Sequence, residues 1–189
     1  IKKFLIYDGE TSDIVESYFP KKDTGIFYIR KEEINLYVLF KVLLKTGFKN
    51  FFSNYQKVYF EYSKPKFVIN LLDINVNFYK LKKNFPQIIF IGIQKLPRLA
   101  ERELTGFVDQ KDLKCDYFFT ISKFHAKAYE SYVDIKEIIQ IGSFVNNHFP
   151  FKEKKSKKIL FIPGCSSAHV YETDLITFNL LADYAKLKK

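Results

Sequence analysis

The sequence predicts a doubly wound α/β fold, in which helices cover both faces of a parallel β-sheet. Short runs that are apolar at nearly every position recur along the chain, for example FVINLL at 67–72 and IIFIGI at 88–93. Longer segments with helical patterning separate these runs. Continuous apolar strands are buried on both faces, and strands that alternate with helices form parallel sheets. The predicted arrangement is therefore Rossmann-like.

Six strands are predicted, each from a short apolar run bounded by turn or helix signals. They lie at residues 3–7, 25–29, 67–72, 88–93, 117–121 and 138–141. The first run ends at the turn signal Asp8-Gly9, and the third begins after Pro65.

The segments between these strands predict helices at 11–19, 33–45, 51–62, 76–84 and 123–132. The helix at 33–45 ends at Gly47 and is apolar on nearly every face, so we expect it to be buried on most sides. The segment 97–110 is charged and contains Gly106, which predicts a loop that could hold a short helix.

Two domains are expected. Residues 1–149 form the Rossmann-like N-terminal domain, and 150–158 (PFKEKKSKK) is a charged linker. Residues 159–189, with a strand at 159–162, a loop and a helix at 170–188, are the start of a second α/β domain. The alternative is that this helix packs back on the first domain as a brace. Because the chain contains no Met and stops inside a predicted helix, we expect a truncated fragment.

The formal net charge is +10, but it comes almost entirely from scattered lysines. Arginine occurs only at positions 30, 98 and 102. A surface that binds nucleic acid favours arginine forks and exposed interleaved aromatic residues, so no nucleic-acid partner is expected. Weak attraction to an anionic membrane surface fits the lysines better.

The two cysteines, Cys115 and Cys165, have no metal-ligand spacing and predict reduced thiols. No run is long and apolar enough to span a bilayer, which favours the cytoplasm, with a peripheral position at the inner membrane left open.

Candidate site residues were sought at the carboxyl ends of the strands, where parallel sheets bind ligands. Asp8 follows the first strand. The candidates after the later strands are Arg30 and Glu33, then Asp73 and Asn75, then Gln94 and Arg98, and finally Gly142, Ser143 and Asn146.

Each candidate also has a structural interpretation. Asp73 and Asn75 are good helix caps, and Glu33 suits the first turn of a helix. Arg30 could pair with Glu32 or Glu33, and Gly142-Ser143 could form a tight turn into the linker. The P-loop, the Gly-x-Gly-x-x-Gly fingerprint and the Gly-x-Ser-x-Gly elbow are absent from the sequence, so the first strand does not predict a dinucleotide site.

Three stretches carry a resemblance to a known family. They are 29–36 (IRKEEINL), 65–94 (from PKFVINLLDINVNFYKL to FIGIQ), and 139–147 (IQIGSFVNN) with 158–162 (KILFI) after the linker. In this order they resemble the bacterial surface carbohydrate (polysaccharide) biosynthesis proteins, a family of GT-B-like glycosyltransferases with two Rossmann domains. More distantly, the chain is similar to the Kdo transferases of capsule and lipopolysaccharide assembly. It departs from the family pattern at Ile74 and at Lys95-Leu96.

The resemblance implies transfer of a sugar from a nucleotide-activated donor to a glycan or lipid-linked glycan acceptor, with the N-terminal half on the acceptor side. Asp73, with Glu33 as second choice, would take the acceptor proton or stabilise positive charge. Arg30 and Arg98 would orient the acceptor or meet anionic groups of the donor, and Asn75 and Gln94 would bind sugar hydroxyls. Backbone amides at Gly142 and Ser143 could meet a phosphate or sugar, and Asn146 would bind beside them.

No cofactor and no metal are expected, since no Asp-x-Asp pair is present, and the fragment alone is expected to be inactive. Two other hypotheses stay open. One is another two-Rossmann enzyme, such as a nucleotide-sugar epimerase or a polyol-phosphate transferase. The other is a non-catalytic binding or scaffold subunit.

Overall fold

The computed structural model describes residues 2–10, 12–30, 33–98, 104–149 and 168–187. The chain divides into two compact units, Ile1–Pro150 and Phe151–Lys189, and each is described by itself.

The first unit is built on a six-stranded, all-parallel sheet with the order β2-β1-β3-β4-β5-β6. The strands are β1 (Phe4–Tyr7), β2 (Thr24–Phe27), β3 (Phe67–Asn70), β4 (Ile89–Ile93), β5 (Lys114–Thr120) and β6 (Asp134–Gln140). Each of the six predicted strands overlaps one of these, and the prediction of a Rossmann-like, doubly wound α/β fold is confirmed.

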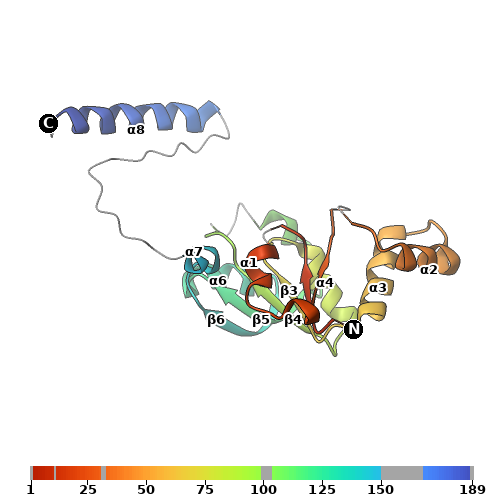
Figure 1. The fold of residues 1–189 in the computed structure, drawn as a ribbon. Coiled ribbons are helices and arrows are strands. Elements are labelled where there is room, and N and C mark those ends of the chain that lie inside the picture. The colour runs from red at the N-terminus through yellow and green to blue at the C-terminus, as the bar shows by residue number, and fades with distance from the viewer. Residues whose placement is uncertain (1, 11, 31–32, 99–103, 150–167, 188–189) are drawn as a thin grey trace. The chain divides into compact units, whose positions relative to one another are not determined.

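Helices connect the strands (Figure 1). They are α1 (Ser12–Glu16), α2 (Leu36–Thr46), α3 (Phe51–Ser63), α4 (Val76–Asn84), α6 (Lys123–Glu130) and α7 (Phe144–His148), with short 3-10 turns η1 (Lys21–Asp23) and η2 (Thr105–Phe107). Five of these helices were predicted. The short helix α7 was not, because the sequence there was interpreted as a turn into the linker.

The two faces of the sheet are covered unequally. The chain leaves β1 toward β2 on one side and then runs in the opposite direction from β2 to β3 and on to β6. Because such crossovers are right-handed, α1 falls on one face and α3, α4 and α6 fall on the other. Along β1, Leu5 therefore packs in the larger core cluster with Phe78 of α4, while Ile6 packs in the smaller one with Val15 of α1.

The structure tests two sequence expectations about single residues, one through backbone conformation and one through burial. Gly47 ends α2 with φ of 59°, a left-handed conformation that glycine adopts without strain, as expected for a helix stop. Cys115 is buried in β5, and burial raises the pKa of its thiol to about 12, so it stays protonated and unreactive. Cys165 lies outside the described residues.

The prediction that the helix at 33–45 is buried on most sides is wrong. Of α2, only Val38 and Val42 are buried, and the helix packs on α3 beyond the β2 edge of the sheet (Figure 1). The sequence was misleading because a helix that is apolar all round gives no sign of which face is covered.

The second unit contains α8, Ala168–Leu187, where a helix was predicted at 170–188. The strand expected at 159–162 and the linker expected at 150–158 lie outside the described residues. No helix in the described part of the chain is long and apolar enough to cross a membrane.

Candidate functional site

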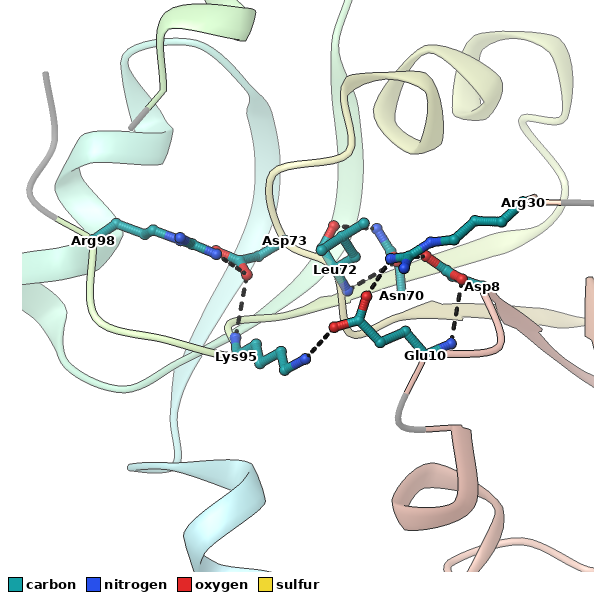
Figure 2. A network of polar contacts seen from close by, with 8 residues as sticks. All are labelled: Asp8, Glu10, Arg30, Asn70, Leu72, Asp73, Lys95 and Arg98. Carbon is teal, nitrogen blue, oxygen red and sulfur yellow. Dashed lines mark hydrogen bonds and ion pairs between the residues drawn. The ribbon is translucent and has the colours of Figure 1, made fainter. Parts of the chain in front are cut away.

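The strand order places a topological switch point between β1 and β3, since the connections from these two neighbours depart in opposite directions. In doubly wound sheets, ligands bind in the crevice outside the carboxyl ends of the strands at this point. The residues that follow β1 and β3 are Asp8, Glu10 and Asp73. They meet residues that follow β2 and β4 in one polar network (Figure 2).

Asp8 forms the β1 side of the network. Its φ is 104°, a conformation that costs a non-glycine residue of the order of 1–3 kcal/mol and is found mainly at functional sites. The Oδ1 atom accepts the backbone N–H of Glu10 at 3.2 Å, and Oδ2 pairs with Arg30 Nη2 at 3.1 Å. The strained turn thus fixes a buried carboxylate beneath the guanidinium of Arg30.

Glu10 stands between two cations. One carboxylate oxygen pairs with Arg30, and the other lies 2.6 Å from Lys95 Nζ. Hydrogen bonds from Lys95 and Arg30 lower the pKa of Glu10 below its ordinary value, so the group is ionised at neutral pH.

Asp73 forms the β3 side and is fully buried. Arg98 donates two hydrogen bonds to this carboxylate, one from Nε to Oδ2 at 3.1 Å and one from Nη2 to Oδ1 at 3.3 Å. The backbone N–H of Lys95 donates to Oδ1 at 3.3 Å, and the hydroxyl of Tyr129 donates to Oδ2. Each carboxylate oxygen therefore accepts two hydrogen bonds, which fills the capacity of the group.

Lys95 joins the two halves of the network, as Figure 2 shows. Its backbone holds Asp73 and its side chain holds Glu10. The switch-point cluster is the name given to the six charged groups of this network, which are Asp8, Glu10, Arg30, Asp73, Lys95 and Arg98.

Exposure increases from the base of the switch-point cluster to its rim. The side chains of Asp73 and Asp8 are 0% and 2% exposed, those of Arg98 and Lys95 are 13% and 21%, and those of Glu10 and Arg30 are 37% and 48%. Buried carboxylates therefore position the cations, and Glu10 is the carboxylate of the cluster that solvent or a ligand can reach. With three carboxylates balancing three cations, the cluster carries no excess positive charge.

A hollow of about 360 Å³ lies beside Lys95. Leu96 and Pro97 line it from the loop after β4, and Ser143 and Asn146 line it from the start of α7. The hollow and the switch-point cluster share Lys95, so both belong to the carboxyl edge of the sheet. Of the residues proposed from sequence, Ser143 and Asn146 line this hollow, whereas Arg98 belongs to the switch-point cluster and does not line it.

Gln94 is buried behind this hollow. Its Oε1 accepts the hydroxyl of Thr120 at 2.8 Å and the backbone N–H of Ile121 at 3.0 Å. The amide orientation is fixed, because Ile121 N–H can only donate. The Nε2 donor has no hydrogen-bond acceptor among the described residues. Gln94 thus connects β4 to β5 and leaves one buried donor unsatisfied.

Several predicted site residues have structural roles. Asn75, not Asp73, is the N-cap of α4, where its side chain accepts the backbone N–H of Asn77 at 3.1 Å. Ser143 caps α7 by accepting the N–H of Asn146 at 3.2 Å, and Gly142 makes the preceding turn with φ of 73°. Asn146 remains exposed at the rim of the hollow.

Glu33 lies at a different place. It lines two adjoining hollows of about 270 and 360 Å³ beside α3, together with Tyr28, Ile34 and Tyr55. No contact described in the structure joins Glu33 to Asp73. Arg30 forms its ion pairs with Asp8 and Glu10, as described above. Glu32 and Arg102 lie outside the described residues.

Glu10, Lys95 and Tyr129 belong to the site but were not predicted from the sequence. Glu10 and Lys95 are 85 residues apart, and no local pattern pairs them. The only available signal was position, since each follows the end of a predicted strand by a few residues.

A hollow of about 730 Å³ lies at the opposite, amino edge of β3 and β4. Its lining is mostly apolar, including Phe60, Phe67 and Phe85, and it contains none of the switch-point residues. Among the described side chains, no group of three or more His, Cys, Asp and Glu residues is arranged to hold a metal ion. Metal-independent chemistry stays a prediction.

Comparison with known proteins gave no match to a family model, to a curated protein or to a solved structure.

Proposed function

We propose that the chain is the acceptor-side part of a glycosyltransferase that builds bacterial surface polysaccharide, using a nucleotide-activated sugar as donor. The observation that carries the proposal is the switch-point cluster, in which ionised and accessible Glu10 is held between Arg30 and Lys95. The resemblance of the sequence to surface carbohydrate biosynthesis proteins supplies the reaction class.

The charge balance of the cluster favours a polyhydroxyl acceptor over the donor diphosphate. A phosphate site needs excess positive charge or a set of unpaired backbone amides. The switch-point cluster instead offers alternating donors and acceptors, which is what sugar hydroxyl groups require because each hydroxyl both donates and accepts.

Glu10 is the group that accepts a hydrogen bond from the attacking hydroxyl in this proposal. Its lowered pKa makes it a weak base, which suits an oxocarbenium-like transition state where the proton leaves late. Asp73 was the first choice from sequence, but its oxygens are filled by Arg98, Lys95 and Tyr129. It is assigned to positioning Arg98 and the Lys95 loop.

A second candidate is a binding subunit without turnover. The observation that favours it is the same saturation of Asp73, which removes the best buried candidate for a base. Such a subunit would bind sugars at the same site as the proposed transferase but would not catalyse their transfer.

A transfer assay on the full-length protein tests the proposal. A panel of nucleotide sugars that includes CMP-linked acidic sugars is incubated with surface-glycan oligosaccharides, and products are detected by mass spectrometry. Glu10→Gln is compared with Asp112→Asn, which alters another lysine-paired carboxylate, with Lys83, at the amino edge of β5.

Transfer by the parent and by Asp112→Asn, with kcat lowered roughly 100-fold or more in Glu10→Gln, supports the proposal. Glycan binding without product supports the binding subunit. Absence of both binding and product overturns the proposed function.

A further inference from the structure

Helix α2 exposes an apolar stripe. Leu36, Phe40 and Leu44 are 74%, 63% and 72% exposed and are spaced four residues apart, so they lie along one side of the helix. Phe48 follows the Gly47 turn that ends the helix and is 85% exposed. Leaving these large side chains in water is unfavourable, because the cost rises with the apolar surface exposed.

A row of lysines runs beside this stripe. Lys41, Lys45 and Lys49 are all exposed and are also spaced four residues apart, one position after Phe40, Leu44 and Phe48. The ammonium of Lys41 lies 4.6 Å from the ring centroid of Tyr37, which is itself 51% exposed. Lys41 and Lys45 therefore flank the apolar stripe, about 100° around the helix from Phe40 and Leu44.

The segment that contains α2 is basic, although Glu33 precedes it and Glu61 follows it. From 34 to 60 there are four lysines and no Asp or Glu, and this segment forms the whole of α2, the connecting loop and most of α3. Helix α2 packs on α3 and lies outermost, at the end of the unit away from β6 (Figure 1). None of its residues belongs to the switch-point cluster, and its exposed apolar and cationic side chains are available to a partner.

We propose that this face of α2 binds the surface of an anionic lipid bilayer. An exposed apolar stripe flanked by lysines is the pattern of a helix that lies at a membrane surface, and the exposure of α2 excludes the core of this unit. Eleven residues are too few to span a bilayer, so the helix lies in the plane of the interface. The lysines attract anionic headgroups while Phe40, Leu44 and Phe48 enter the acyl boundary.

This inference does not rest on sugar transfer, because vesicle binding needs neither donor nor acceptor. It would place the enzyme beside a lipid-linked acceptor, but failure of the transfer assay would leave it standing.

Co-sedimentation of the full chain with vesicles tests it. Vesicles of phosphatidylcholine with phosphatidylglycerol are compared with phosphatidylcholine alone. Lys45→Gln with Lys49→Gln removes two charges, and Phe40→Ser with Phe48→Ser removes two apolar anchors. Lys123→Gln and Phe124→Ser are the matched controls, since Phe124 on α6 is 73% exposed and Lys123 is exposed beside it.

The expected result is binding to the anionic vesicles that weakens with salt. The lysine pair should lower the partition coefficient about 25-fold, and the phenylalanine pair roughly tenfold or more. Both controls should stay within about twofold of the parent, because their residues lie outside the hairpin.

Absence of anionic vesicle binding by the parent overturns the proposal. It is also overturned if the phenylalanine pair leaves vesicle binding unchanged but dissolves a dimer in size-exclusion chromatography, or exposes α8 to proteolysis. Those outcomes would assign the face to a second copy or to α8. Because the substituted side chains are exposed, circular dichroism should show every variant folded.

Discussion

Arg98 grips Asp73 through two parallel hydrogen bonds, with Nε 3.1 Å from Oδ2 and Nη2 3.3 Å from Oδ1. The carboxylate is fully buried and the guanidinium nearly so, which makes the pair a fixed part of the sheet edge. A paired, buried carboxylate of this kind holds its neighbours in position, and only Glu10 of the same cluster offers a reachable carboxylate.

Replacing Asp73 should therefore affect folding before it affects chemistry. Asp73→Ala removes the carboxylate that accepts two hydrogen bonds from Arg98 and one from the Tyr129 hydroxyl, and breaking such a buried pair costs about 3–5 kcal/mol. Urea denaturation measures the loss. A denaturation midpoint equal to that of the parent would show that Asp73 does not organise the edge.

Tyr129→Phe should cost about 1–2 kcal/mol, because it removes a buried hydrogen bond to a charged group. Burial raises the pKa of Tyr129 far above its ordinary value, so the hydroxyl is a donor at every accessible pH. Tyr132→Phe is the matched control, since no hydrogen bond of its hydroxyl is described. Equal loss in both variants would contradict the contact between Tyr129 and Asp73.

Glu10→Gln should change how stability depends on pH. Hydrogen bonds from Lys95 and Arg30 lower the pKa of Glu10 in the folded state below its ordinary 4.5. The contribution of Glu10 is thus present above pH 4.5 and is lost as the pH falls through the folded value. Urea midpoints of parent and variant should differ near pH 7 and converge in acid. A difference that is constant with pH would be inconsistent with these ion pairs.

Asp116→Ala should destabilise the sheet by about 3–5 kcal/mol, because it leaves the buried ammonium of Lys82 without its carboxylate. In the parent, Lys82 Nζ lies 2.6 Å from Asp116 Oδ2. Burial alone would raise the pKa of Asp116, but hydrogen bonds from Lys136 and Lys82 lower it. The loss should therefore shrink as the pH falls below 3.8. Asp112→Asn, at an exposed pair and with a side chain that tolerates the φ of 60° there, should leave the midpoint unchanged, and similar effects of both variants would refute the distinction.

The sequence predicted the six strands and the edge at which polar residues collect, because continuous apolar runs and strand ends are local features. It also placed Asp73 at that edge. It could not predict which charges pair, since Glu10 reaches Lys95 and Tyr129 reaches Asp73 only through the strand order. The position of Asn75 after a strand also led to an emphasis on sugar binding, whereas its side-chain amide serves as the N-cap of α4.

The sequence did not predict the exposure of α2, for a different reason. Apolar residues at nearly every position of 33–45 fit a buried helix and a lipid-facing helix equally well. Only the packing of Val38 and Val42 on one side, with Phe40 and Leu44 exposed on the other, separates the two cases.

Amide NMR of the chain during titration with surface-glycan oligosaccharides shows whether sugars bind at the switch-point cluster. Saturable shifts should appear at Glu10 and Lys95, should be absent at the amino edge around Phe67 and Ile89, and should be lost in Glu10→Gln. Shifts confined to the amino edge, or an oligosaccharide response that persists unchanged in Glu10→Gln, would contradict the account.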